Sequence, residues 1–293
     1  MKPPYPIIDA HVHIFPWENI RPDAASKMNQ RPDMAEIYEM CQDPARLIAY
    51  MDERNIERLV MINYVAPETQ GYAEEVNAYS VRMASYAPGR LIPFGGSDPR
   101  RVEDVGAEMD HLLGELGIKG IKIHPPHQLL HVNAYRDTPE LKGLAAVYEK
   151  CIEYNIPVMI HTGTSVFPRA RNRFGNPLDI DDVMVDFPDL KMIIAHGGRP
   201  LWMDEAFFVL RRWPENTFLE ISSVPPKKLL DYYPLNERVI DQAMFGSDWP
   251  GPGVIDPAVN AADVYALPIS DLAKRKLLRE TAEKVFGFTN GEG

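Results

Sequence analysis

Residues 7–14 have the sequence Ile-Ile-Asp-Ala-His-Val-His-Ile, in which apolar and polar side chains alternate. Side chains alternate across a β-strand, so residues two positions apart point to the same face. The pattern therefore predicts a strand whose apolar face packs against surrounding helices and is formed by Ile8, Ala10 and Val12. The polar face is then formed by Asp9, His11 and His13, and we expect the two histidines to point into the centre of the fold.

Short apolar runs recur along the chain and alternate with segments of helical periodicity. The expected strands are Ile7–His13, Arg58–Asn63, Leu91–Gly96, Lys119–His124, Pro157–His161, Lys191–His196, Thr217–Ser222 and Ala243–Asp248. The clearest expected helices are Pro44–Asn55, Gly71–Tyr86, Val102–Leu116, Pro139–Tyr154 and Leu201–Arg212. Strict alternation is typical of parallel strands joined by crossovers, and no glycine-rich phosphate loop indicates an open doubly wound sheet. The sequence predicts a single α/β domain over residues 1–293, a (β/α)8 TIM barrel.

One segment, from Ile14 to about Gln42, does not fit this alternation and contains several prolines. A loop of this length in a compact domain is usually functional or disordered. Because it follows the first strand, we expect an insertion that covers the mouth of the barrel. The proline-rich segment Gly251–Pro257 follows the last strand and is expected at the same mouth.

The composition limits the kinds of partner. The 293 residues include 31 Lys and Arg against 42 Asp and Glu, a formal net charge of −11, so neither nucleic acid nor a membrane surface is an expected partner. Cys41 and Cys151 lie far apart and indicate no disulfide framework. The amino-terminal residues resemble neither a secretory signal nor a membrane span, which predicts a cytoplasmic protein. A homo-oligomer such as a dimer is left open.

Polar residues recur at the ends of three other expected strands. Each shares a face with a residue two positions earlier, and the pairs are Met159 with His161, Ile194 with His196, and Gly246 with Asp248. A single histidine is more often a hydrogen-bonded core residue than a ligand. Four strands that deliver such residues to one rim favour a shared site, because barrel active sites form at the carboxyl ends of the strands.

Imidazole and carboxylate groups together suit Zn, Mn, Fe or Co, and the His11-X-His13 pair is a compact clip for one metal. Three or four protein ligands leave room for water. A bound metal lowers the pKa of that water and makes hydroxide available near neutral pH.

The chain resembles the amidohydrolase superfamily in five motifs taken in order. They are Ile-Ile-Asp-Ala-His-Val-His-Ile (7–14), Gly-Ile-Lys-Ile-His-Pro (120–125), Met-Ile-His-Thr-Gly (159–163), Ile-Ile-Ala-His-Gly-Gly (193–198) and Phe-Gly-Ser-Asp-Trp-Pro (245–250). More narrowly, they look like the branch that contains aminocarboxymuconate semialdehyde decarboxylase. The resemblance covers nearly the whole chain.

This resemblance implies a role for each polar strand end. His11, His13 and His161 would bind the metal, and Asp248 would be the fourth ligand or the catalytic base. His196 would be a catalytic residue that orients water or the substrate and carries a proton. The implied cofactor is one divalent transition metal, Zn²⁺ in the first place and Mn²⁺ as the alternative.

Binuclear relatives use a carboxylated lysine on the fourth strand, where this chain has Lys122 and His124 on one face. We favour a barrel-interior cation for Lys122, paired with a carboxylate such as Asp9 or Glu220, over a bridging role. His124 lies nearer the rim and is expected to contact the substrate.

Basic residues follow two of the expected functional strands in a chain that is otherwise acidic. Arginine binds carboxylates through paired N–H groups, which predicts a small carboxylate-bearing substrate. The candidate contacts are Arg199, Arg169 and Arg171, with Arg173 in the same group; for the 169–173 group, surface ion pairing is an equal alternative. His127 and His131 are expected near the mouth, and Phe15, Trp17 and Trp249 are candidates for an apolar wall.

The preferred function is hydrolysis of a small carboxylate-bearing amide, lactone or ester by metal-activated water. The alternative is non-oxidative decarboxylation of a muconate-type or aromatic acid. Hydroxybenzoate decarboxylases of the resembling branch usually have Glu-X-His on the first strand and a Glu after the sixth-strand histidine, whereas this chain has His-X-His and Arg199. A non-enzymatic metal- or ligand-binding barrel is the remote third reading, since all five expected positions are filled.

Overall fold

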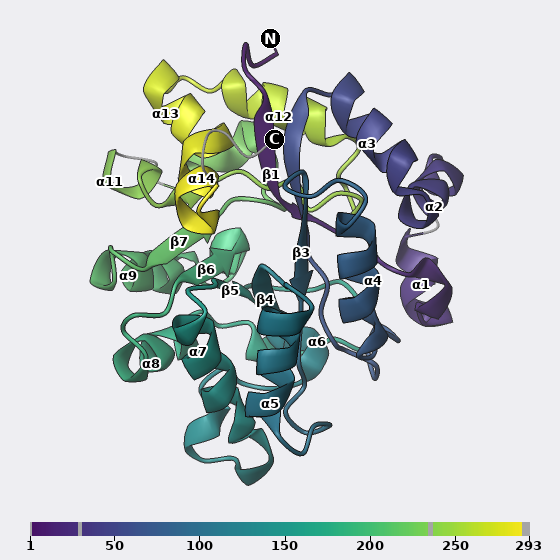
Figure 1. The fold of residues 1–293 in the computed structure, drawn as a ribbon. Coiled ribbons are helices and arrows are strands. Elements are labelled where there is room, and N and C mark those ends of the chain that lie inside the picture. The colour runs from purple at the N-terminus through teal and green to yellow at the C-terminus, as the bar shows by residue number, and fades with distance from the viewer. Residues whose placement is uncertain (1, 29–30, 234–236, 289–293) are drawn as a thin grey trace.

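The computed structural model describes residues 2–28, 31–233 and 237–288. Its eight parallel strands form one sheet in sequence order, with helices arranged around them (Figure 1). The strands are β1 (Ile7–Val12), β2 (Ile56–Met61), β3 (Leu91–Gly95), β4 (Gly120–Ile123), β5 (Val158–His161), β6 (Met192–Ala195), β7 (Thr217–Glu220) and β8 (Ala243–Met244). The Ala10 N–H donates to the Phe245 carbonyl (3.0 Å) and the Asp248 N–H to the His11 carbonyl (2.8 Å), so β1 and the β8 segment meet. The predicted (β/α)8 barrel is confirmed.

The helices follow the strands in the expected alternation. They are α1 (Pro22–Met28), α2 (Met34–Gln42), α3 (Pro44–Glu53), α4 (Glu75–Ala84), α5 (Val105–Asp110), α6 (Pro125–Gln128), α7 (Gly143–Glu153), α8 (Asp179–Asp186), α9 (Met203–Arg212), α10 (Leu229–Tyr232), α11 (Glu237–Ile240), α12 (Pro257–Tyr265), α13 (Asp271–Arg275) and α14 (Thr281–Phe286). Each of the five helices expected from the sequence overlaps one of these, and the observed helix is shorter than the expected one at one or both ends. Within the described ranges, no helix is long and apolar enough to cross a membrane.

The barrel has an apolar interior below its carboxyl-end mouth. One buried cluster takes residues from β1, β2, β3, β5, β6, β7 and β8, which is possible only inside the barrel: Ile8, Ala10, Val60, Ile62, Ile92, Phe94, Met159, Ile193, Ala195, Phe218 and Met244. Ala282 and Val285 of α14 pack against this cluster. The other strand faces belong to the larger cluster between strands and helices. The apolar filling below and the polar groups above place the site at the carboxyl ends.

The predicted faces of the first strand are partly wrong. Ile8 and Ala10 belong to the barrel-interior cluster, and only Val12 packs toward the helices. The pairing of β1 with β2 shifts register between Asp9 and Val12. Such an irregularity re-aims the following side chains, which explains how Ala10 and His11 both face inward.

Seven of the eight strands end earlier than expected, and for β6 and β8 the early end changes how a site residue is placed. In β6, Ile194 packs toward the helices rather than sharing a face with His196, because the strand stops at Ala195. His196 has φ of 65° and Asp248 has φ of 63°, in the left-handed region that breaks the strand direction. Both catalytic candidates therefore lie on turns just past their strands, and these turns carry the side chains to the mouth.

The insertion after the first strand lies at the mouth, as predicted, but it contains helices α1 and α2 rather than a bare loop (Figure 1). Phe15, Ile20 and Met28 from this segment line the pocket described below. The Arg169 Nε donates to Asp23 Oδ2 on α1 at 2.8 Å, which ties the insertion to the loop after β5. Gly251 and Pro252, from the loop after β8, line the same pocket.

Candidate active site

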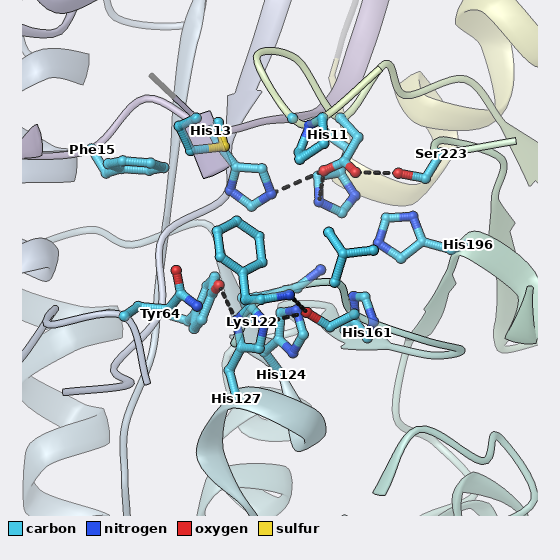
Figure 2. A pocket seen from close by; sticks show the side chains of 18 of the residues that line it. His11, His13, Phe15, Tyr64, Lys122, His124, His127, His161, His196 and Ser223 are labelled. Atoms are coloured by element: carbon cyan, nitrogen blue, oxygen red, sulfur yellow. Dashed lines mark hydrogen bonds and ion pairs between the residues drawn. The ribbon is translucent and has the colours of Figure 1, made fainter. Parts of the chain in front are cut away.

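A pocket of about 290 Å³ opens at the carboxyl end of the barrel (Figure 2). Part of its polar lining comes from residues at or just past the ends of seven strands: His11, His13, Tyr64, Lys122, His124, His161, His196, Ser223 and Asp248. The volume suits a small molecule rather than a polymer segment. The structure thus brings all the predicted metal ligands, together with His196, into one cavity.

The rings in this pocket form a closed circle of contacts. The centroid distances are 5.1 Å for His13–His11, 4.9 Å for His11–His196, 4.7 Å for His196–His161, 3.7 Å for His161–His124, 5.1 Å for His124–Tyr64 and 6.4 Å for Tyr64–His13. We call this set the ring circle. Tyr64 and His124 lie on the opposite side of it from His11 and His196, as Figure 2 shows.

Three of the histidines are oriented through Nδ1. His11 Nδ1 lies 2.7 Å from Glu220 Oε2, and His13 Nδ1 lies 3.1 Å from the carbonyl oxygen of Ile62. His196 Nδ1 lies 3.2 Å from the carbonyl oxygen of Ser222. A carbonyl oxygen can only accept, so Nδ1 carries the proton in the last two, and a Glu220 carboxylate orients His11 in the same way. In all three rings Nδ1 makes the orienting contact and Nε2 points to the pocket, the arrangement that metal-binding histidines use.

Glu220, at the end of β7, is the residue that the sequence reasoning undervalued. It was considered only as a partner for Lys122, yet its carboxylate orients His11 and accepts bonds from the N–H (2.6 Å) and hydroxyl (2.8 Å) of Ser222. Burial raises the pKa of Glu220, and the neighbouring His196 and Ser222 oppose that rise. A glutamate in an otherwise apolar buried strand was the signal that pointed to this role.

Asp248 sits among the imidazoles. Its Oδ1 lies 3.0 Å from His13 Nε2 and 3.5 Å from His11 Nε2, and its Oδ2 accepts a hydrogen bond from the Ser223 hydroxyl. Burial on its own raises the pKa of Asp248, but the contact with His13 and the nearby His11 and His196 rings hold it well below its usual range. The carboxylate is therefore ionised at neutral pH.

These contacts fit a divalent cation. His13 Nδ1 faces the Ile62 carbonyl, so its Nε2 faces Asp248 Oδ1 at 3.0 Å, and two such atoms at this distance need a proton or a cation between them. Two ligands of one tetrahedral Zn²⁺, each at roughly 2.0–2.1 Å, lie about 3.3 Å apart. Buried Nε2 atoms of His11 and His161 have no hydrogen-bond partner among the described residues. The donor set is thus free to hold a metal.

In the described ranges, one group of at least three His, Cys, Asp or Glu residues brings its ligand atoms within 4.8 Å of one another, and this compact group consists of His11, His196 and Asp248. Burial lowers the pKa of the His11 and His196 rings, so both stay neutral and able to coordinate or accept a proton. His196 was predicted for proton transfer and His13 and His161 for coordination. His196 therefore lies where its ring could contact a metal held by the other ligands, or a water molecule bound to that metal.

Two cations line the pocket without a carboxylate partner in the part of the chain that the structure describes. Lys122 is fully buried and its Nζ makes no hydrogen bond, and burial lowers its pKa to about 8. The expected ion pair of Lys122 with Asp9 or Glu220 is absent; Asp9 Oδ1 instead accepts from the Ser247 N–H at 2.9 Å. Arg199 uses Nη1 on the Thr164 carbonyl (2.9 Å), and its buried Nε has no partner in these ranges.

Several predicted contacts lie outside the pocket. Arg169 pairs with Asp23, and Arg171 is exposed, so neither lines the cavity. His131 pairs with Asp179 at 2.6 Å on the surface. Trp17 and Trp249 are buried in the core and do not line the pocket. Of the three aromatic residues expected there, only Phe15 lines it. Arg199 and His124 are the predicted substrate contacts that the structure brings into the pocket.

Sequence reasoning missed the hydroxyl groups. Tyr64 and Ser165 line the cavity, and Ser223 holds Asp248. None of them belongs to a recognisable motif, but Tyr64 and Ser223 each come shortly after the end of a strand, and Ser165 lies in the loop after β5. That position at the mouth is the signal that was available.

The chain is similar to known proteins in sequence and in fold. Residues 8–288 match the model of the amidohydrolase family. A search of curated proteins gave no significant match. The chain is similar to a solved uncharacterised TIM-barrel protein from Bordetella bronchiseptica, with 24% identity, TM-score 0.71, and coverage of 96% of this chain and 98% of that one.

Two other solved structures share the fold at lower identity. A 5-carboxyvanillate decarboxylase from Novosphingobium aromaticivorans, with bound manganese and 3-methoxy-4-hydroxy-5-nitrobenzoic acid, has 16% identity, TM-score 0.65 and 97% coverage of each chain. A 4-oxalomesaconate hydratase from Rhodopseudomonas palustris has 18% identity and TM-score 0.61, covering 96% of this chain and 95% of that one. At these identities the likeness establishes the fold alone.

Proposed function

The chain belongs to the amidohydrolase family, and we propose that it hydrolyses a small carboxylate-bearing lactone, ester or amide with a divalent metal. Family membership makes it an enzyme, which sets aside the non-enzymatic barrel. The observation that carries the proposal is the Asp248 carboxylate, held by Ser223 and 3.0 Å from His13 Nε2, beside Nε2 atoms of His11 and His161 that have no hydrogen-bond partner in the described ranges.

His11, His13, His161 and Asp248 would hold the metal. All four line one cavity, Nε2 of His11 and of His161 has no hydrogen-bond partner in the described ranges, and His13 Nε2 faces Asp248 Oδ1. We propose Zn²⁺ with Mn²⁺ as the alternative; imidazole and carboxylate ligands suit both, and one solved relative in fold carries manganese. When bound, the metal supplies Lewis-acid polarisation and lowers the pKa of water at the site.

Side chains of the protein would carry out the proton transfers. Asp248 Oδ1 takes one proton from the attacking water as its oxygen bonds to the substrate carbonyl carbon. His196 relays a proton at Nε2 to the leaving oxygen or nitrogen as the C–O or C–N bond breaks. The Ser222 carbonyl holds the other side of that ring. Aromatic side chains of Phe15 and Tyr72 restrict water on the insertion side.

The two unpaired cations, Lys122 and Arg199, indicate a negatively charged substrate. A buried ammonium and a guanidinium without a carboxylate partner in the described ranges cost folding free energy that an anionic ligand offsets. Arg199 is assigned to the substrate carboxylate, with His124 as a further contact, and Lys122 adds positive potential at the floor of the pocket.

Decarboxylation is the second candidate, favoured by the same two cations and by the 5-carboxyvanillate decarboxylase among the structures of similar fold. In that reaction the bond from carbon to the carboxylate breaks, carbon dioxide leaves, and His196 is placed to deliver a proton to the carbon. Hydrolysis consumes water and releases no carbon dioxide.

The deciding experiment is a screen of the Zn²⁺- and Mn²⁺-loaded enzyme against carboxylate-bearing lactones, esters and amides and against aromatic and unsaturated acids. Acid release and carbon dioxide release are followed in parallel. Turnover with acid release alone supports hydrolysis, and carbon dioxide release in its place selects the second candidate. As a control, Asp248→Asn should abolish either signal. Turnover that survives this change would refute the role given to Asp248.

A further inference from the structure

The pocket contains a chain of three hydrogen-bonded side chains that the proposed hydrolysis does not use. Tyr64 Oη lies 2.8 Å from His127 Nδ1, and His127 Nε2 lies 2.7 Å from Ser165 Oγ. All three residues line the cavity, and His127 is only 2% exposed. We call them the Tyr64–His127–Ser165 chain.

This chain lies on the side of the pocket away from the catalytic groups. His127 stacks on His124 with a centroid distance of 3.5 Å and an interplanar angle of 6°. In the ring circle, His124 and Tyr64 are opposite His11 and His196, and Figure 2 shows His127 next to them. A substrate whose reacting bond lies at Asp248 would therefore extend its other end toward this chain.

Counting protons shows that the chain has a hydrogen-bond donor to spare. Two hydroxyls and one neutral imidazole carry three protons, but the two links between them use only two. The third proton stays on the hydroxyl of Tyr64 or of Ser165, depending on the tautomer of His127. Neither hydroxyl has another acceptor in the described ranges, and Ser165 Oγ only accepts, from the Phe167 N–H at 3.3 Å. A protonated His127 would leave two spare protons, so the conclusion does not depend on its charge.

Backbone contacts hold the chain in place. The Thr69 hydroxyl donates to the carbonyl of His127 at 2.8 Å, and the Ser165 N–H donates to Asn172 Oδ1 at 2.8 Å. Burial raises the pKa of Tyr64 and lowers that of His127, which favours the neutral forms. A fixed donor of this kind is what a specificity contact requires.

We propose that the Tyr64–His127–Ser165 chain is a specificity subsite that donates a hydrogen bond to a hydroxyl or carbonyl oxygen of the substrate. The favoured substrate is then a hydroxy- or oxo-substituted carboxylate, small enough for a cavity of about 290 Å³. This inference rests on the proposed function only in assigning the carboxylate to Arg199. His127 acts through the two hydroxyls and is a positioning residue, while Tyr64 or Ser165 touches the oxygen.

The test measures binding and needs no turnover. Metal-loaded protein is titrated calorimetrically with benzoate and the three hydroxybenzoates, and with pentanoate and 4-oxopentanoate. At least one oxygen-bearing acid should bind roughly three- to tenfold more tightly than its parent acid, the gain of one hydrogen bond. The ratio of the two Kd values is the readout, because general damage to the pocket weakens both acids together.

The double variant Tyr64→Phe/Ser165→Ala removes both hydroxyls and should bring that ratio to about one, with binding of the parent acid changed less than about twofold. Tyr72→Phe tests the rival donor, because Tyr72 lines the same pocket and its buried hydroxyl has no hydrogen-bond partner in the described ranges. It should keep the preference. Thermal unfolding checks that the variants fold, and the single variants show which hydroxyl donates.

The proposal is overturned if no oxygen-bearing acid exceeds its parent by threefold, or if the double variant keeps the preference. Failure of the proposed hydrolysis would look different, because it removes turnover in the substrate screen while leaving these binding ratios intact. Loss of all carboxylate binding in Arg199→Gln, with the preference for oxygen retained by neutral 4-hydroxybenzamide over benzamide, would separate the two subsites directly.

Discussion

The two ends of the barrel treat their charged groups in opposite ways. At the amino end, Arg279 donates to the carbonyl of Pro6 (3.0 Å) and to Glu57 Oε1 (3.1 Å), and its Nε lies 2.7 Å from Glu283. At the carboxyl end, Lys122 Nζ and Arg199 Nε have no hydrogen-bond partner in the described ranges, and neither do the Nε2 atoms of His11 and His161.

The difference indicates that unpaired groups at the carboxyl end lower the free energy of unfolding and are retained for ligand binding. Buried polar groups normally have hydrogen-bond partners, and a group without one costs about 1–3 kcal/mol. At the amino end Arg279 follows that rule, although the buried Tyr5 hydroxyl and Arg58 Nε there have no hydrogen-bond partner in the described ranges. At the carboxyl end, a bound metal and an anionic substrate would supply the partners that the unpaired nitrogen atoms and cations lack. Substitutions at the two ends should therefore have different effects on metal binding and on stability.

The largest effect is expected from His11→Ala. This change removes a candidate ligand whose Nδ1 is already fixed by Glu220, so metal content should fall to less than about a tenth of an equivalent, with activity lost. Elemental analysis after dialysis measures it, and circular dichroism should show a folded protein. His111→Ala, at an exposed histidine on the surface, is the control that should keep its metal. An unfolded His11→Ala would mean that a core residue was taken for a ligand.

His196→Asn should separate chemistry from coordination. Asparagine keeps a hydrogen bond toward Ser222 but cannot carry a proton, so kcat should fall by roughly 10²–10⁴-fold with near-normal metal content. The pH–rate profile should also lose one limb. Since His196 belongs to the compact group with His11 and Asp248, loss of metal together with high activity on readdition would make it a ligand instead.

Lys122→Met tests the cost of an unpaired cation. In the metal-loaded protein, replacing this buried ammonium by an apolar side chain of similar shape should raise the free energy of unfolding by about 1–3 kcal/mol and weaken binding of benzoate. Lys150→Met is the matched change at a cation paired with Asp110 and Glu153, and it should be neutral or slightly destabilising. Denaturant unfolding compares them. If Lys122→Met were the more destabilising of the two, the contrast between the ends would fail.

The smallest effect concerns the amino end. Glu57→Gln removes the carboxylate that accepts two bonds from Arg279, and should lower the free energy of unfolding by about 0.5–1 kcal/mol at pH 7. Hydrogen bonding from Arg279 lowers the pKa of Glu57 below its ordinary value of 4.5. The contribution is therefore present above about pH 4.5 and lost as the pH falls through the lowered folded value. A difference between the two proteins that grows below pH 4 would contradict this pairing.

Much of the site was predictable because it follows the period of a strand. His161 closes a strand whose Met159 fills the barrel interior, and Lys122 shares its face with His124, as the alternation requires. The helices were found in order for the same reason, from their apolar period. Motif order then gave the family.

The rest depends on backbone turns and distant contacts that carry no local signal. His196 and Asp248 reach the mouth through left-handed turns, which nothing in their flanking residues required. Glu220 contacts His11, which is 209 positions away in the sequence. Arg169 donates a hydrogen bond to Asp23 and does not line the pocket. Partners so far apart in sequence meet only once the barrel has closed.

We infer that a bound metal coordinates the unpaired Nε2 atoms of His11 and His161 at the carboxyl end. The most direct test is elemental analysis of the purified protein, grown with added Zn²⁺ or Mn²⁺ and dialysed. We predict about one equivalent of a divalent transition metal per chain, as four ligand groups around one position require. Less than about a tenth of an equivalent under both growth conditions would contradict the account, and the free nitrogen atoms of His11 and His161 would need another explanation.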